Sequence, residues 1–122
     1  MNPYREQANV IKAMGHPTRL RILDILSEYE ACVCHLTTVL RKPQPNVSQH
    51  LMVLRQAGLV TDRRDGVIIY YRLADERVAA IVRLTRRVLR SNGTEVAFPQ
   101  VPVSPVPGCP CPKCTGAASC SF

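Results

Sequence analysis

EACVCHLTTVLRKPQPNVSQHLMVLRQAG, residues 30–58, is the stretch that decides the fold. Its first half predicts a short helix over 34–40, and residues 41–44 form a turn. Its second half predicts a helix over 45–57, because apolar side chains recur at Val47, Leu51 and Leu54. Two short helices joined by a tight turn are typical of a helix-turn-helix.

The flanking segments predict the rest of the domain. Helices are expected over 3–14 and 18–28, and a last helix is expected to start at about Asp75 and to end near 91. Asp65-Gly66 is a strong hairpin signal that joins a strand starting at Leu59-Val60 to a β-branched return strand over 67–73. The predicted fold is mainly α with a small β-hairpin: a winged helix-turn-helix of about five helices plus a two-stranded wing.

The character of the chain changes after Ser91. The whole formal charge of +7 belongs to residues 1–90, since 91–122 contain one Lys and one Glu. Six of the ten prolines fall between Pro99 and Pro112, which predicts an extended or polyproline-like linker. The sequence therefore predicts a folded domain over 1–91, followed over 92–122 by a flexible Pro-rich linker and a Cys-rich tail.

Composition limits the compartment and the partners. The chain has no apolar run of about 18 residues and no apolar signal core near its start, so a cytoplasmic protein without a membrane partner is expected. Six cysteines in a reducing compartment favour metal or redox chemistry over a disulfide framework. A basic domain favours a polyanionic partner, although a protein that is merely basic is the simpler alternative.

Short polar side chains near the start of the 45–57 helix form a candidate DNA-reading surface. Ser48, Gln49 and His50 fit the requirement for side chains that reach base edges in the major groove. Contacts to phosphate are expected from Lys42 in the turn and from Arg63 and Arg64 in the wing. A solvated helix face is the alternative, and the turn, the wing and the charge pattern together argue against it.

Cys32 and Cys34 stand at the start of the predicted 34–40 helix. Inside a regular helix an i, i+2 pair points about 200° apart, so the two thiols can serve one ion only at a frayed or pre-helical start. A helix N-terminus favours the thiolate form, and thiolates select thiophilic ions. The alternative is a pair of buried structural cysteines.

The sequence resembles the ArsR/SmtB family of metal- and metalloid-responsive winged-helix repressors. The blocks that match are AMGHPTRLRIL at 13–23, CVCHL at 32–36, VSQHLMVLRQAGLV at 47–60 and RRDGVIIYYRL at 63–73. Over about 5–90, the resemblance implies a homodimer built from the first and last helices. It also implies binding to double-stranded operator DNA, with Asn46 beside the reading residues, and loss of DNA when the inducer binds. Cys32 and Cys34 match the inducer motif of the family's arsenic, cadmium and lead sensors.

Departures from the family pattern make this thiol pair incomplete. Thr37 stands where arsenic sensors of one type have a third cysteine, and residues 1–31 lack the cysteines that cadmium and lead sensors of another type use. The last predicted helix lacks the histidines of the family's zinc-type site, and His35 is expected at the surface. The missing ligands are expected from the tail cysteines Cys109, Cys111, Cys114 and Cys120.

The sequence thus predicts a repressor that senses a thiophilic metal(loid) through thiolates. Three thiolates would suit As(III), Sb(III) or Pb(II), and four would suit Cd(II); As(III) or Sb(III) is favoured. The alternatives are a repressor responding to Cd(II) or Pb(II), a thiol redox or persulfide sensor on the same scaffold, and a Cys-rich metal buffer. No enzyme is expected, because no nucleophile, base and orienting group stand together in the sequence.

Overall fold

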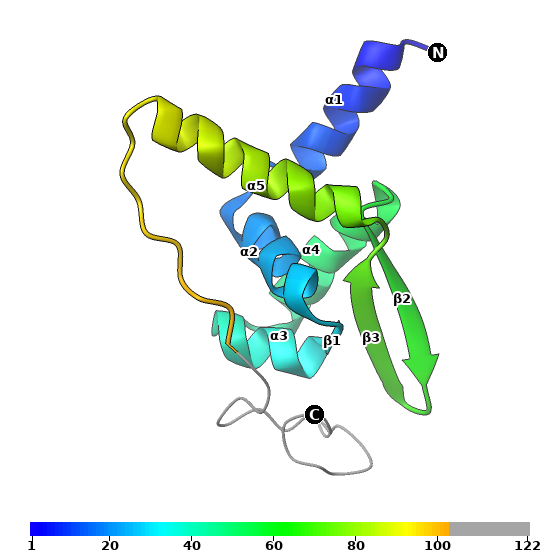
Figure 1. Ribbon diagram of the computed structural model, residues 1–122. Helices are drawn as coiled ribbons and strands as arrows, with labels where there is room; N and C mark the ends of the chain where they lie inside the picture. The colour runs from blue at the N-terminus through cyan, green and yellow to red at the C-terminus, as the bar shows by residue number, and fades with distance from the viewer. Residues whose placement is uncertain (103–122) are drawn as a thin grey trace.

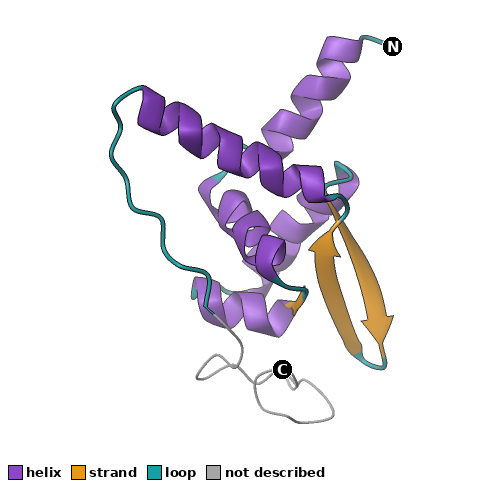
Figure 2. Cartoon of the chain, in the orientation of Figure 1, coloured by secondary structure: helices purple, strands orange, loops and turns teal. Residues whose placement is uncertain are grey.

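Five helices and three short strands make up the described part of the chain, residues 1–102 of a computed structural model (Figures 1 and 2). The helices are α1 (Pro3–Met14), α2 (Pro17–Glu28), α3 (Val33–Leu40), α4 (Gln44–Gln56) and α5 (Glu76–Ser91). The strands are β1 (Ala31–Cys32), β2 (Val60–Asp65) and β3 (Ile68–Leu73). The fold is the predicted winged helix-turn-helix. The tail cysteines Cys109, Cys111, Cys114 and Cys120 lie outside the described residues.

Local capping explains where the helices begin. The Asn2 side chain accepts hydrogen bonds from the first turn of α1, and the Asp75 side chain accepts one from the N–H of Arg77 in α5. α4 has Pro43 at its N-cap without a side-chain hydrogen bond, and Pro45 lies in its first turn. Since the ring of Pro45 presets a helical φ, α4 starts without a Ser or Thr cap.

The sheet contains one strand more than the two-stranded wing predicted from sequence. It is antiparallel in the order β1-β3-β2, with Cys32 opposite Tyr70. β1 has only two residues, too few for a strand pattern in the sequence, and it exists because β3 supplies its partner. The wing hairpin pairs Asp65 with Ile68, so the turn residues are Gly66 and Val67. Gly66 takes the positive φ of 63° that this first turn position needs.

The core forms where α2 packs between the other helices and the sheet (Figure 1). The predicted apolar face of α4 is confirmed, because Val47, Leu51 and Leu54 are fully buried. They meet residues that are also buried on the remaining elements, namely Ile22, Leu23, Ile25, Leu26, Leu36, Leu40, Leu59, Val60, Val78 and Val82. A single core thus fixes α3 and α4 against α2.

The apolar side chains of α5 divide into two groups. Val78 and Val82 are buried in the core, whereas Ile81, Leu84 and Val88 are 41%, 54% and 59% exposed. The exposed residues recur at i, i+3 and i+7, so they form a continuous stripe along one side of the helix. α1 leaves the body of the molecule beside this helix (Figure 1). The stripe is therefore an apolar surface with no cover within residues 1–102.

Residues 94–102 form neither helix nor strand. They run from the end of α5 back along the molecule toward α3 (Figure 1). Within residues 1–102, no helix is both long and apolar enough to span a membrane.

Candidate functional site

The two thiol residues of the deciding stretch converge at the start of α3. Cys32 is the N-cap, with extended backbone angles of φ −85° and ψ 165°, and Cys34 is in the first turn. Their Sγ atoms lie 2.7 Å apart, and the residues are 2% and 1% exposed. Because β1 pairs with β3, Cys32 stays outside the helical rotation and points to the same place as Cys34. This pre-helical geometry is the one in which the two sulfurs of an i, i+2 pair can serve one ion.

The thiol pair is not a complete metal site within residues 1–102. No group of three or more His, Cys, Asp and Glu side chains there is arranged to hold a metal. Thr37, where the resemblance implies a third cysteine in one type of arsenic sensor, donates a hydrogen bond from its hydroxyl to the Cys34 carbonyl at 2.8 Å. Cys34 is disulfide-bonded. Two buried, converging sulfurs fit a thiophilic ion once Cys34 is reduced and a further ligand is supplied.

His35 lies in the interior, so its expected surface position is wrong. It is 2% exposed, and its Nε2 lies 2.8 Å from the Tyr29 hydroxyl, with the two rings edge to face. The Tyr29 hydroxyl donates its one hydrogen to the carbonyl of Pro102 at 2.6 Å. The His35 ring therefore donates from Nε2 to the Tyr29 oxygen. The contacts among His35, Tyr29 and Pro102 could not be predicted from local sequence, because Pro102 is 73 residues from Tyr29.

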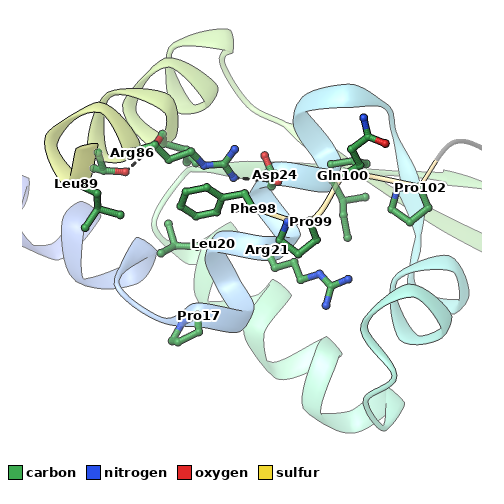
Figure 3. A pocket seen from close by; sticks show the side chains of 14 residues that line it. Pro17, Leu20, Arg21, Asp24, Arg86, Leu89, Phe98, Pro99, Gln100 and Pro102 are labelled. Carbon is green, nitrogen blue, oxygen red and sulfur yellow. Dashed lines mark hydrogen bonds and ion pairs between the residues drawn. The ribbon is translucent and has the colours of Figure 1, made fainter. Parts of the chain in front are cut away.

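Residues 98–102, which we call the strap, pack against α2 and α5 (Figure 3). The Arg86 guanidinium lies over the Phe98 ring at 4.1 Å and pairs with Asp24 at 2.9 Å. Beneath these contacts is a mostly apolar cavity of about 350 Å³. The strap ends at Pro102. The hydrogen bond from the Tyr29 hydroxyl to the Pro102 carbonyl brings this end of the strap beside α3. Phe98 is the single aromatic residue within 94–102, and it was the sequence signal for this packing.

The polar face of α4 is exposed where DNA-reading side chains are expected. Asn46 and Gln49 are exposed, and Ser48 and His50 are half-buried. Ser48 accepts a hydrogen bond from the Gln44 side chain at 2.9 Å. Asn46, Gln49 and His50 recur at i, i+3 and i+4, so the structure brings these three to one side of the helix.

The two wing arginines have different surroundings. Arg64 is exposed near the hairpin tip. Arg63 makes two hydrogen bonds to the Glu30 carboxylate and lies 4.6 Å from the centre of the Tyr70 ring. Hydrogen bonding to Glu30 raises the pKa of Arg63 above its ordinary value. Arg63 therefore ties the wing to the residue before β1, and Arg64 and the exposed Lys42 face solvent.

Comparison with known proteins places these features in a family. The profile described as "Bacterial regulatory protein, arsR family" matches residues 16–62. A helix-turn-helix-type transcriptional regulator of Methanocaldococcus jannaschii is 44% identical over 85 residues, which are 69% of this chain and 96% of that protein. The transcriptional repressor SmtB of Mycobacterium tuberculosis is 45% identical over 73 residues, 60% of this chain and 54% of that one. The arsenic resistance regulator ArsR1 of Pseudomonas putida is 42% identical over 84 residues, 68% and 66% of the two chains.

A solved structure shares the fold. It is a homodimeric winged helix-turn-helix DNA-binding domain from Mycobacterium bovis, described as a possible ArsR-family transcriptional regulator. It superimposes with a TM-score of 0.67 at 33% identity, covering 80% of this chain and 89% of that one. The relatives and this neighbour are transcriptional regulators. This agrees with the expectation from the sequence that the protein is not an enzyme.

Proposed function

This chain belongs to the ArsR/SmtB family of winged-helix transcriptional repressors, and we propose that it is a cytoplasmic, thiol-based sensor of a metal(loid). As a homodimer it binds double-stranded operator DNA and represses transcription. It leaves the operator when Cys32, Cys34 and one or more tail thiolates bind a thiophilic ion, with As(III) or Sb(III) favoured over Cd(II) or Pb(II). In this proposal residues 1–91 bind DNA and dimerise, and 92–122 supply ligands.

The observation that carries the proposal is the convergence of Cys32 and Cys34 at the start of α3. Their sulfurs are buried and 2.7 Å apart, and α3 leads through one turn into the proposed reading helix α4. A change in the position of the α3 start is therefore transmitted over one short helix to the DNA face. Allosteric couplings of about 1–3 kcal/mol would change operator affinity about 5- to 150-fold.

The strap supports the tail as the source of the missing ligand. Its last residue, Pro102, bonds to Tyr29, and Tyr29 contacts His35, the neighbour of Cys34. The chain is thus directed to the thiol pair seven residues before the first tail cysteine. The proposed tail ligands are Cys109, Cys111, Cys114 and Cys120. Three-thiolate ligation would supply As(III) or Sb(III) with its preferred soft donors.

The DNA-binding part of the proposal rests on α4 and the wing. Asn46, Ser48, Gln49 and His50 would face base edges, and Lys42, Arg63 and Arg64 would contact phosphates. Arg64 and Lys42 are exposed for this role, and Arg63 would act while paired with Glu30.

The apolar stripe on α5 supports a homodimer. Ile81, Leu84 and Val88 are exposed over one side of the helix, and such stripes are usually covered by a partner. Tyr4 and Ile11 on α1 are also exposed, at 79% and 59%. A second copy would cover both helices, and the similar domain from Mycobacterium bovis is homodimeric.

Fluorescence anisotropy with labelled operator DNA tests the sensing step. Under reducing conditions, saturating As(III) is expected to weaken operator binding by about 5- to 150-fold. A Cys32→Ser, Cys34→Ser variant should bind DNA equally well and respond to no ion. Changing each tail cysteine to serine identifies the remaining ligands. Unchanged operator binding by the wild type at saturating As(III), Sb(III), Cd(II) and Pb(II) would rule out metal sensing.

The disulfide at Cys34 favours a second candidate, a thiol redox sensor on the same scaffold. In that case oxidation of Cys34, and not ion binding, would change operator affinity. Mass spectrometry of the protein released from DNA separates the two: a bound ion with reduced thiols supports metal sensing, and a disulfide or sulfur adduct supports redox sensing.

A further inference from the structure

A pair of histidines lies where the start of α2 meets α4. The ring of His50, in the second turn of α4, lies against the ring of His16, with centroids 4.4 Å apart and planes inclined at 42°. His16 also caps α2, because its Nδ1 accepts a hydrogen bond from the N–H of Thr18 at 3.1 Å. This bond leaves the proton of the neutral His16 ring on Nε2, so the ring presents an N–H donor.

Positive charge gathers around this pair. Arg19 from α2 and Lys42 from the turn before α4 act on His50 together with His16. Burial lowers the pKa of His50 from its ordinary value, and the three neighbours lower it further. Within the described residues, no carboxylate contributes to this shift. Arg19 is half-buried, and its Nε is buried without a hydrogen-bond partner among residues 1–102.

Donors and positive charge held together in this way are suited to an anion. An oxyanion would accept a hydrogen bond from Arg19 and offset the repulsion among the cationic neighbours. His50 lies on the same side of α4 as Asn46 and Gln49, the proposed reading residues. When that side of α4 faces DNA, the anion next to the cluster is a phosphate of the DNA backbone.

We propose that His16, Arg19, Lys42 and His50 form a phosphate-binding site that holds the operator backbone beside the reading helix. The inference rests on the proposed DNA-binding function. It assigns His50 to the DNA backbone and not to a base edge, and it adds His16, Arg19 and a dependence on pH. A phosphate next to His50 stabilises its charged ring, so formation of the complex takes up a proton. Operator affinity therefore rises as the pH falls, by at most ~tenfold per pH unit for one proton.

The pH dependence is tested by anisotropy at constant ionic strength between about pH 8 and about pH 5.5. Wild type should bind the operator ~3- to 10-fold more tightly at the acidic end. His50→Gln should remove most of this change, because its amide does not titrate. His16→Asn should reduce the change while still capping α2, since Asn is a good N-cap residue. An unchanged pH dependence in His50→Gln would overturn the proposal.

The role of Arg19 is tested by comparing Arg19→Gln with a variant that loses the same charge at a distant, exposed position. Arg19→Gln should weaken operator binding ~tenfold and reduce the slope of log affinity against log salt by about one. Arg83→Gln removes the same charge from an exposed position on α5 and should have a much smaller effect. Equal effects of the two substitutions would contradict a specific phosphate contact. Circular dichroism melts of each variant verify that it folds.

Nuclear magnetic resonance of the histidine rings identifies the anion. Together with the binding measurements, it distinguishes failure of the phosphate site from failure of the proposed DNA-binding function. The His50 pKa should rise when operator DNA binds and stay nearly unchanged in inorganic phosphate alone. An equal rise with phosphate alone would assign the cluster to free oxyanions and overturn the backbone assignment. Absence of salt-sensitive operator binding by wild type would refute the proposed function itself, whereas pH-independent operator binding would refute only the phosphate site.

Discussion

The starts of α3 and α4 make an instructive comparison, because each places polar or nucleophilic side chains near a helix N-terminus. At α3 these side chains, Cys32, Cys34 and His35, are buried, whereas at α4 Asn46 and Gln49 are exposed. β1 and the strap contact the α3 region, while the polar side of α4 is open within residues 1–102. The same local arrangement therefore gives a buried thiol pair in one helix and an exposed polar surface in the other.

The largest expected effect is a loss of stability when a core leucine of α3 or α4 is shortened, and it tests whether the two helices share one core. Leu36 on α3 and Leu51 on α4 are both 0% exposed. Leu36→Ala and Leu51→Ala should each lower the free energy of unfolding by ~2–5 kcal/mol, since each leaves a cavity in a packed interior. Urea denaturation of the two variants measures this. A loss below ~1 kcal/mol for Leu36→Ala alone would show that α3 is held less firmly than α4.

A smaller effect, on binding and not on folding, is expected on the open surface. Gln49→Ala should cost ~1–3 kcal/mol of operator affinity through a lost base contact, and should change stability by no more than ~0.5 kcal/mol. Met52→Ala, at a 53% exposed position of the same helix, is the control. Anisotropy with operator and scrambled duplexes measures both. If Gln49→Ala weakens both duplexes equally, the residue does not read bases.

A substitution in the buried α3 region should have the opposite effect, reducing stability and leaving operator affinity unchanged. Tyr29→Phe removes the hydroxyl that joins His35 to the carbonyl of Pro102. The expected loss is about 1 kcal/mol of unfolding free energy, with operator affinity in the absence of inducer unchanged. Thermal denaturation and anisotropy measure the two quantities. If Tyr29→Phe instead caused a large loss of operator affinity with no loss of stability, the α3 region would behave like the exposed surface of α4.

The smallest effect concerns the charge of His50. Its pKa is lowered in the folded protein, so the unfolded chain binds a proton more readily. Stability of the DNA-free protein should therefore be full above about pH 6.5 and fall modestly as the pH drops below that value. His50→Gln should remove this decline in melting temperature. A melting temperature that rises on acidification in wild type, but not in the variant, would contradict the sign.

Much of the fold follows from local sequence patterns. The five predicted helices occur close to their expected bounds, and the apolar spacing of Val47, Leu51 and Leu54 identified the buried side of α4. The hairpin formed at the predicted place, with the turn shifted by one residue to Gly66 and Val67. α5 was different, because periodicity alone could not distinguish the side buried in its own chain from the stripe left exposed.

The sequence by itself determined the winged helix-turn-helix, the exposed polar side of α4 and the presence of a thiol pair at the start of α3. These depend on helix periodicity, turn residues and ligand chemistry, which act over a few neighbouring residues. Only the tertiary structure decided that β1 turns Cys32 toward Cys34, that His35 is interior and that the strap reaches Tyr29. The physical reason is that each of these depends on a contact between segments distant in sequence, and such contacts form only when the chain packs around one core.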